Sequence, residues 1–351
     1  MMKKVCVIGT VGIPACYGGF ESLVENLVDN SSDSIRYNVF CSSKSYSEKL
    51  GDYKGAKLHY ISLKANGIQS VPYDIWSLIK CIKLRPDVVL ILGVSGCIFL
   101  PIFSKLSRCK IVTNIDGLEW KRDKWSKLAK RFLKFSESLA VKYSDSVITD
   151  NKAIGDYVLE EYGVSSAVIA YGGDHALRDI EVNDSDREYA LSICRIEPEN
   201  NIEMILKAFS KSRYDLKFVG NWDANEYGKR LKQKYSKYKN IEIIDPIYNL
   251  DTLFSLRKRS SIYIHGHSAG GTNPSLVEMM HFGVPIIAYD CNFNRYTTHN
   301  YAKFFSDSEE LIEHISMCND SWKEFGRQLS YVAQQQYSWK RINEQYESLY
   351  S

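Results

Sequence analysis

A glycine-rich stretch around residue 270 carries residue types suited to binding an anion. Residues 265–290 read HGHSAGGTNPSLVEMMHFGVPIIAYD, which predicts a strand, a glycine-rich loop, a short helix, a Gly-Val-Pro turn and a second buried strand. Such a loop exposes backbone N–H groups at a helix N-terminus, which suits a phosphate or a sugar hydroxyl. Glu278 lies inside this helix and can accept hydrogen bonds from a diol such as a ribose. The alternative is a buried strand-turn-helix whose glycines serve only its turns.

A second glycine-rich segment, GTVGIPACYGGFE at residues 9–21, directly follows an apolar run. It fails the dinucleotide pattern G-x-G-x-x-G, because positions 11 and 14 are Val and Pro, and the chain has no P-loop G-x-x-x-x-G-K-[ST]. Gly18 and Gly19 still open a predicted helix with Glu21 in its first turn, and adjacent glycines let backbone N–H groups approach a diphosphate. A plain tight turn would explain the same residues.

Two further strand ends carry candidate ligand-binding residues. Arg195 ends a predicted strand in SICRIEPENN, where a guanidinium can hold a diphosphate and stabilise charge on a leaving group. The alternative is a structural ion pair with Glu197 or Glu199. Gly220, in FVGNW, would let the backbone approach a nucleotide, although this signal is weak alone.

The segment NIDGLEWKRDKW, residues 114–125, follows another predicted strand. Asp116 and Glu119 should project at the carboxyl edge of the sheet, where a carboxylate can orient a hydroxyl or act as a general base. The alternative for Asp116 is a helix cap.

A basic amphipathic helix is predicted to begin at Trp120. Its polar side chains are Lys121, Arg122, Lys124, Lys127, Lys130, Arg131 and Lys134. Its apolar residues are Trp125, Leu128, Ala129, Phe132 and Leu133. Such a helix can lie on an anionic membrane surface or contact a lipid diphosphate, and the alternative is an ordinary helix with a core face and a solvated face.

Strand and helix patterns alternate along the chain, which predicts an α/β fold with mostly parallel sheets. The expected strands are 5–10, 37–40, 57–63, 87–93, 110–116, 145–150, 189–194, 215–220, 241–245, 261–266 and 285–290. Helical patterns include 20–30, 201–212, 225–237, 250–258, 275–281 and a final segment at about 321–349. We predict an N-terminal domain over 1–172, a second domain over 173–330 and a C-terminal helix over 331–351.

Bulk properties narrow the function class. A chain of 351 residues predicts two domains, and 44% hydrophobic with 25% charged residues is ordinary for a soluble protein. A net charge of +3 argues against a dedicated nucleic-acid binder. Nine scattered cysteines without a CxxC predict reduced thiols and no zinc site. The apolar runs are too short for a signal peptide or a spanning helix, so we expect a cytoplasmic protein that is soluble or peripheral on the inner membrane.

Together the segments resemble glycosyltransferase family 4, the retaining enzymes of GT-B fold. More narrowly, they are similar to its bacterial capsule and O-antigen rhamnosyltransferases. The matching pieces occur in order: GTVGIPACYGGFE, NIDGLEWKRDKW, DSVITDNKAIGDY, IAYGGD, CRIEPENN, FVGNW and HGHSAGGTNPSLVEMM. The resemblance implies two Rossmann-like domains facing across a cleft, with a C-terminal helix crossing back to the N-terminal domain.

The resemblance also implies residue roles. Asp116 would lie near the reacting sugar, Arg195 would bind the donor diphosphate and Glu278 the ribose. The implied donor-side set is Gly18, Gly19, Arg195, Asn200, Gly220, Gly271, Thr272, Asn273 and Glu278. The implied acceptor or membrane side comprises Glu119, Trp120, Lys121 and Arg122.

Two departures from the family pattern bear on the donor. The usual Glu-x7-Glu becomes Gly270 and Glu278, and the usual basic residue five positions after the arginine is Asn200. The first change removes an acceptor for hexose hydroxyls, which makes a deoxysugar easier to accept, and the second leaves Arg195 as the main local cation.

The implied reaction moves a sugar, L-rhamnose from dTDP-rhamnose, to a lipid-linked saccharide acceptor in bacterial surface polysaccharide synthesis. We expect no metal or other cofactor, because Arg195, helix N-termini and the glycine loops can meet the charge of the leaving diphosphate. The alternatives are a UDP- or GDP-linked donor, a nucleotide-sugar epimerase of GT-B fold, or a non-catalytic subunit of glycan assembly.

Overall fold

A computed structural model describes residues 2–16, 18–121, 125–182 and 189–351. The chain forms two compact units. The N-terminal unit is Met1–Ala170 together with Trp339–Ser351, and the C-terminal unit is Tyr171–Ser338. The sequence predicts boundaries between the parts of the chain after residues 172 and 330. In the structure the corresponding boundaries lie after residues 170 and 338.

The described residues of the N-terminal unit form an eight-stranded sheet of order β3-β4-β2-β1-β5-β6-β7-β8. Its strands are β1 (Lys3–Ile8), β2 (Ile35–Ser42), β3 (Asp52–Tyr53), β4 (Ala56–Ile61), β5 (Val88–Leu92), β6 (Lys110–Asn114), β7 (Ser146–Thr149) and β8 (Ala167–Val168). The short β3 runs antiparallel to β4, and the remaining described pairs are parallel. The central strand β5, VVLIL, is buried along its whole length, as expected for a parallel strand covered on both faces.

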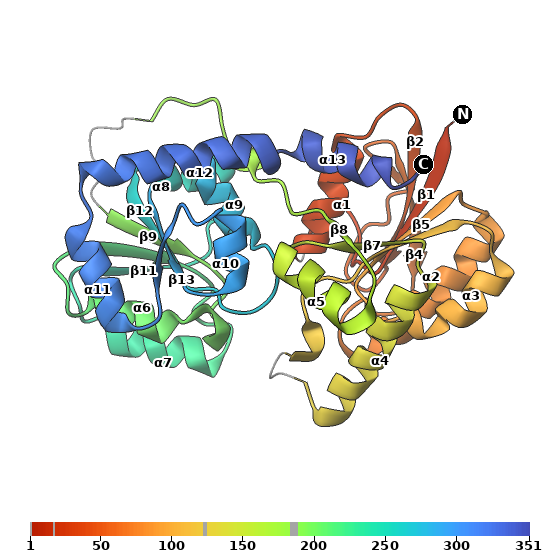
Figure 1. The fold of residues 1–351 in the computed structure, drawn as a ribbon, viewed down its shortest axis with the longest axis horizontal. Helices are drawn as coiled ribbons and strands as arrows, with labels where there is room; N and C mark the ends of the chain where they lie inside the picture. The colour runs from red at the N-terminus through yellow and green to blue at the C-terminus, as the bar shows by residue number, and fades with distance from the viewer. Residues whose placement is uncertain (1, 17, 122–124, 183–188) are drawn as a thin grey trace. The chain divides into compact units, whose positions relative to one another are not determined.

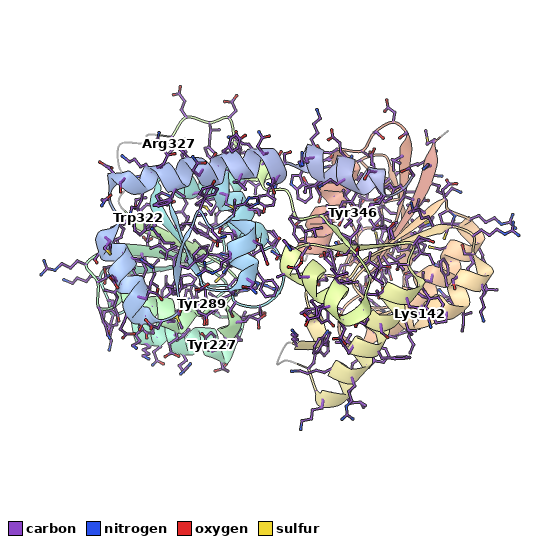
Figure 2. The ribbon with its side chains drawn as sticks, viewed as in Figure 1. Lys142, Tyr227, Tyr289, Trp322, Arg327 and Tyr346 are labelled. Carbon is purple, nitrogen blue, oxygen red and sulfur yellow. The ribbon has the colours of Figure 1, made fainter. Side chains whose placement is uncertain are left out.

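Helices pack on this first sheet. They are α1 (Gly19–Asp29), α2 (Ser70–Leu84), α3 (Leu100–Leu106), α4 (Lys127–Tyr143), α5 (Lys152–Tyr162) and α13 (Trp339–Ser348). The last of these, α13, lies beside α1 (Figure 1), and Asn343 donates to the carbonyl oxygen of Asn30 over 2.7 Å. Tyr346 of α13, labelled in Figure 2, is fully buried in this unit. The end of the chain therefore belongs to the N-terminal unit, as the fold prediction required.

The described residues of the C-terminal unit form a six-stranded parallel sheet of order β11-β10-β9-β12-β13-β14. Its strands are β9 (Tyr189–Ile193), β10 (Asp215–Val219), β11 (Ile241–Ile244), β12 (Ser260–His265), β13 (Ile286–Tyr289) and β14 (Lys303–Phe305). Its helices are α6 (Ile202–Phe209), α7 (Glu226–Tyr235), α8 (Leu250–Lys258), α9 (Pro274–Met280), α10 (Asn292–Thr297), α11 (Ser308–Met317) and α12 (Lys323–Gln336). Figure 1 shows the strands between α6 and α7 below and α8 and α12 above.

The final helical segment predicted at about 321–349 is broken in the structure, and the C-terminal helix predicted over 331–351 corresponds to α13, Trp339–Ser348. The structure has a 3-10 turn, Asp320–Trp322, followed by α12, which ends at Gln336, and α13, which begins at Trp339. Trp322, labelled in Figure 2, packs into the core of the C-terminal unit with Phe218 and Trp222. The amphipathic pattern runs through both helices, which is why the sequence alone does not reveal the break.

Each sheet reverses its strand order at one central position. In the N-terminal unit β1 lies between β2 and β5, and in the C-terminal unit β9 lies between β10 and β12. Ligands of open parallel sheets bind outside the carboxyl ends of the strands at such a point. The loops that begin at Gly9, Cys194 and Gly266 follow β1, β9 and β12, so the predicted segments fall where the topology favours a ligand.

Across the described ranges of the chain, no helix is both long enough and apolar enough to cross a bilayer.

Candidate functional site

The loop after β9 presents Arg195 at the surface. Arg195 is exposed, and its guanidinium makes no ion pair or hydrogen bond with another described residue. The alternative of a structural pair with Glu197 or Glu199 is therefore not realised among these residues. The peptide carbonyl of Arg195, by contrast, is fixed, because the Asn200 amide donates to it over 2.7 Å and the Glu197 N–H over 2.9 Å. A rigid backbone thus carries a solvent-facing cation.

Asn200 braces this loop from inside. It is buried, its Nδ2 donates to the Arg195 carbonyl, and its Oδ1 lies 2.8 Å from Nδ1 of His267. Asn200 therefore ties the loop after β9 to the loop after β12.

Glu278 of α9 is held between two basic side chains. Its Oε2 accepts a hydrogen bond from Nη2 of Arg257, a buried residue of α8, and its Oε1 lies 3.3 Å from Nε2 of His175. The Glu278 side chain is 14% exposed. Burial raises the pKa of this carboxyl, but Arg257 and His175 more than offset it, so the pKa lies below its ordinary value. Glu278 is accordingly an ionised, partly accessible hydrogen-bond acceptor at neutral pH.

The glycine-rich loop before α9 has a backbone that its sequence dictates. Gly270 has φ +117°, a conformation that side chains with a Cβ rarely adopt. Gly271 and Thr272 are buried, and Asn273 caps α9 by accepting a hydrogen bond from the Ser275 N–H over 3.0 Å. The Oδ1 of Asn273 is therefore engaged by the first turn of the helix.

Gly220 has a packing explanation. A Cβ at this position would stand 2.4 Å from Cδ1 of Ile196 and 2.8 Å from the carbonyl oxygen of Cys194. Packing against the loop after β9 therefore accounts for a glycine here, and the predicted nucleotide contact of Gly220 stays a prediction.

The glycine loop of the N-terminal unit closes on a buried carboxylate. Glu21, only 4% exposed, accepts hydrogen bonds at Oε1 from the Thr10 hydroxyl and the Val11 N–H, each over 2.7 Å. Its Oε2 accepts from the Gly18 N–H over 2.8 Å. Gly18 is the N-cap of α1 and Gly19 its first residue. Two backbone amides of this loop are thus already bonded to Glu21.

Asp116 lies just beyond β6, which ends at Asn114 rather than continuing to residue 116 as predicted. The strand stops because Asp116 has a left-handed backbone with φ 61°. Its N–H donates to Asn114 Oδ1 over 3.0 Å, while the Asn114 amide donates to the hydroxyl of Tyr346 over 2.8 Å. Asp150, buried directly after β7, lies at the neighbouring position of the same edge and received no role from the sequence.

The basic segment after β6 departs from the prediction. The helix begins at Lys127 with Ser126 as its cap, and Trp120 lies instead in a separate 3-10 turn, Glu119–Lys121. The buried residues of α4 include Leu133, Ser136, Glu137, Ala140 and Val141. Leu128, predicted on the core face, is 79% exposed. Arg122 and Lys124 lie outside the described residues.

Glu137 explains which face of α4 is buried. Its carboxylate accepts hydrogen bonds from the Trp120 indole over 3.1 Å and from the hydroxyls of Tyr157 and Tyr162, each over 2.6 Å. Lys134 lies over the same three rings at 4.7 to 5.0 Å from their centroids. This network organises a pocket of about 810 Å³, whose cationic lining residues are Lys121, Lys130, Arg131 and Lys134. Glu119 accepts a hydrogen bond from the Trp125 indole over 3.0 Å.

Comparison with known proteins gives these features a context. Residues 174–333 match the family model described as glycosyl transferases group 1, and residues 2–174 match a domain of unknown function, DUF1972. An uncharacterized glycosyltransferase of Haemophilus influenzae is 24% identical over 251 residues, covering 70% of this chain and 67% of that protein.

Solved structures agree over nearly the whole chain. Sucrose-phosphate synthase from Thermosynechococcus elongatus superposes with a TM-score of 0.81 at 14% identity, covering 99% of this chain and 98% of the other. HepE of Anabaena, solved with UDP and also with UDP-glucose, gives 0.77 in its UDP complex at 14% identity and 99% coverage of both chains. This protein is a glycosyltransferase of the GT-B fold.

Sequence reasoning assigned no role to three side chains that contact Glu278 or Asn200 in this glycosyltransferase: Arg257, His175 and His267. His267 lies within the motif HGHSAGGTNPSLVEMM, and His175 directly follows the motif IAYGGD. The sequence therefore places both histidines near the predicted site but does not indicate what they contact. Arg257 carries no such signal, because it meets Glu278 from a different helix, 21 positions away. Among the described residues there is no cluster of three or more His, Cys, Asp or Glu side chains arranged for a metal ion.

Proposed function

We propose that this glycosyltransferase moves L-rhamnose from dTDP-rhamnose to a lipid-linked saccharide acceptor, with retention of configuration. The observation that carries the proposal is the loop 265–278, which has Gly270 where the resemblance implies a carboxylate and keeps Glu278. A deoxysugar offers fewer hydroxyls than glucose or mannose, so it loses least from that replacement.

The surroundings of Glu278 support a deoxynucleotide. Arg257 engages one carboxylate oxygen, and His175 lies 3.3 Å from the other. A 2′-deoxyribose presents one hydroxyl to such a group, whereas a ribose presents two. Because each oxygen of Glu278 already has a basic partner, its remaining capacity suits one hydroxyl better than two.

Arg195 is the proposed diphosphate ligand. An exposed guanidinium on a fixed backbone can take a diphosphate bidentately and stabilise the charge that develops as the sugar leaves. On this proposal the reaction uses no metal, and Asp116 orients groups near the reacting sugar.

A donor panel tests this proposal. Purified enzyme is incubated with dTDP-rhamnose, UDP-glucose and GDP-mannose and with undecaprenyl-diphosphate-linked N-acetylglucosamine as the acceptor probe, and both nucleoside diphosphate release and lipid-linked product are measured. We expect product from dTDP-rhamnose. Preferred use of UDP-glucose would favour the second candidate, a UDP-linked donor, which the UDP complexes of HepE suggest. Isomerised nucleotide sugar without acceptor would indicate an epimerase and contradict the proposal.

The acceptor side of the proposal rests on the surface of α4. Leu128 and Phe135 are 79% and 55% exposed, and the basic residues Lys121, Lys130 and Arg131 lie around the adjoining pocket. Exposed apolar side chains flanked by cations match an anionic lipid surface, which attracts basic residues and accepts apolar ones. We propose that this surface contacts the membrane that carries the acceptor.

Vesicle binding tests the membrane contact. Arg131→Glu should weaken binding to phosphatidylglycerol-containing vesicles by about 30-fold, because each charge near an anionic surface contributes about 1 kcal/mol and the reversal changes the charge by two units. Lys239→Glu, the same charge reversal at an exposed position of the C-terminal unit, should not. Equal binding to pure phosphatidylcholine vesicles, or no binding to either kind, would contradict the proposal.

A further inference from the structure

The pocket beside α4 combines aromatic walls with positive charge. It has a volume of about 810 Å³ and is lined by α4, the end of α5 and the turn Glu119–Lys121. Trp120, Phe135 and Tyr162 supply its aromatic surface. A hollow of this size suits one ligand of small-molecule dimensions.

Buried Glu137 holds the walls of this pocket in place. Its carboxylate accepts hydrogen bonds from the Trp120 indole and from the hydroxyls of Tyr157 and Tyr162. Because these donors come from the turn before α4 and from α5, one side chain joins all three segments. A pocket whose walls are already ordered loses little free energy in adapting to a ligand.

The pocket has an excess of positive charge. Glu161, the one acidic residue among the described lining residues, has its Oε1 3.0 Å from Nζ of Lys134 and is thereby compensated. Lys121 and Arg131 make no ion pair with another described residue. Their charges are therefore available to an anion.

The exposed charges of α4 and its neighbour α3 have a single sign. The basic residues of α4 are Lys127, Lys130, Arg131, Lys134 and Lys142, and its one carboxylate, Glu137, is buried. Helix α3, which packs against α4, carries Lys105 and no acidic residue. A surface of one sign attracts an anion, and here it occurs in a chain whose net charge is only +3.

The same two helices also expose apolar side chains. Leu128 and Phe135 of α4 are 79% and 55% exposed, and Ile102 and Leu106 of α3 are 53% and 60% exposed. A ligand with an anionic head and a hydrocarbon chain matches both properties of this region, whereas a free anion matches only one.

We propose that the pocket binds the lipid-linked acceptor through a diphosphate that joins its saccharide to its hydrocarbon chain. Arg131 and Lys121 contact the diphosphate, and the aromatic walls contact the first carbons of the chain. A planar guanidinium suits this role, since it can hold two phosphate oxygens at once. The inference rests on the proposed lipid-linked acceptor and gives that acceptor a defined site in the N-terminal unit.

Calorimetric titration with farnesyl diphosphate, in the absence of vesicles, tests the anionic part of the site. Arg131→Gln should weaken the affinity for farnesyl diphosphate about tenfold, because it removes a charge-assisted contact. Lys239→Gln, which removes an exposed cation of the C-terminal unit, is the matched control and should bind as wild type. Both variants should keep the thermal midpoint within about 2 °C, since both positions are exposed.

The same titration with inorganic diphosphate tests the apolar part. Wild type should bind farnesyl diphosphate at least about tenfold more tightly, because only that probe has a chain to bury. Phe135→Ala should weaken farnesyl diphosphate about threefold to tenfold and leave inorganic diphosphate unchanged. Met317→Ala, at a position of α11 that is likewise 55% exposed, should have no effect on either.

Arg195→Ala distinguishes this pocket from the proposed donor loops and should bind farnesyl diphosphate as wild type does. Loss of binding in Arg195→Ala together with full binding in Arg131→Gln would overturn the inference, as would equal affinity for the two diphosphates. Weaker vesicle binding in Arg131→Glu, combined with unchanged farnesyl diphosphate affinity in Arg131→Gln, would indicate a general membrane surface and contradict the pocket. These titrations contain no nucleotide sugar, so a wrong donor in the donor panel leaves their outcome intact.

Discussion

Two glutamates, Glu21 and Glu278, occupy similar places in the two units and have different surroundings. Each lies in a helix that follows a glycine-containing loop beside the central strands of a sheet. Glu21 is buried against neutral donors from its own loop, Thr10, Val11 and Gly18. Glu278 is partly accessible and faces Arg257 and His175, which come from other segments.

The difference indicates separate roles. A carboxylate that accepts several hydrogen bonds from one loop fixes the conformation of that loop and occupies its amides. A carboxylate held ionised by an arginine keeps the capacity to accept a bond from an incoming hydroxyl. Similar sequence patterns thus give a structural clamp in the N-terminal unit and a candidate ligand contact in the C-terminal unit.

Arg195 offers the strongest test that the C-terminal loops bind the donor. Arg195→Ala should lower kcat/KM by about 100- to 1000-fold, the loss typical of removing one group that stabilises a developing charge. The thermal midpoint should stay within about 2 °C, because an exposed side chain without a described partner adds little stability. Steady-state kinetics and thermal unfolding check both parts. Near-normal turnover would remove Arg195 from the mechanism.

Glu21→Gln tests the other side of the comparison. The variant should lower the free energy of unfolding by about 2 kcal/mol, since an amide NH2 would face one of the loop's own donors in a buried site. The affinity for dTDP should not change. Urea unfolding and calorimetry provide the two measurements. If stability is preserved and dTDP binding is lost, Glu21 is a ligand contact and the contrast with Glu278 is wrong.

Much of the fold could be predicted because buried parallel strands are short apolar runs. The strand predicted at 87–93 is β5, Val88–Leu92, and the one at 189–194 is β9, Tyr189–Ile193. The buried face of α4 could not be predicted from its apolar residues. Glu137 is stabilised on that face by three hydrogen bonds from aromatic residues on other segments, while Leu128 remains exposed. The predicted extension of β6 to residue 116 failed because a strand pattern does not reveal the left-handed backbone of Asp116.

In the candidate site, too, some residues could be predicted from the sequence and others could not. Arg195, Gly270 and Glu278 stand out in the sequence, because strand ends and glycine loops are local patterns. Their partners do not stand out, since the contacts of Arg257 with Glu278 and of Asn200 with His267 join residues 21 and 67 positions apart. Tertiary packing creates these pairs, and a single sequence carries no local mark of them.

Glu278→Gln sharpens the comparison on the binding side. We expect the affinity for dTDP to fall about tenfold, which is the loss of roughly one charge-assisted hydrogen bond. The measurement is calorimetry on folded protein, with Glu313→Gln, an exposed position of α11, as the matched control. Unchanged affinity would show that Glu278 is structural, as we infer for Glu21.

The smallest expected effect is a pH dependence specific to Glu278. Burial raises the pKa of its carboxyl, but Arg257 and His175 together lower it by more, so the net pKa lies below the ordinary value of 4.5. The folded protein therefore binds fewer protons than the unfolded chain around this pH, so the contribution of Glu278 to stability rises with pH. That contribution should be fully present above pH 4.5 and should be lost as the pH falls through the lower folded pKa. The difference in urea midpoint between wild type and Glu278→Gln, measured across this range, should be constant above pH 4.5 and shrink below it. A difference that grows on acidification would mean that the folded state raises the pKa of Glu278, and would exclude Arg257 as its stabilising partner.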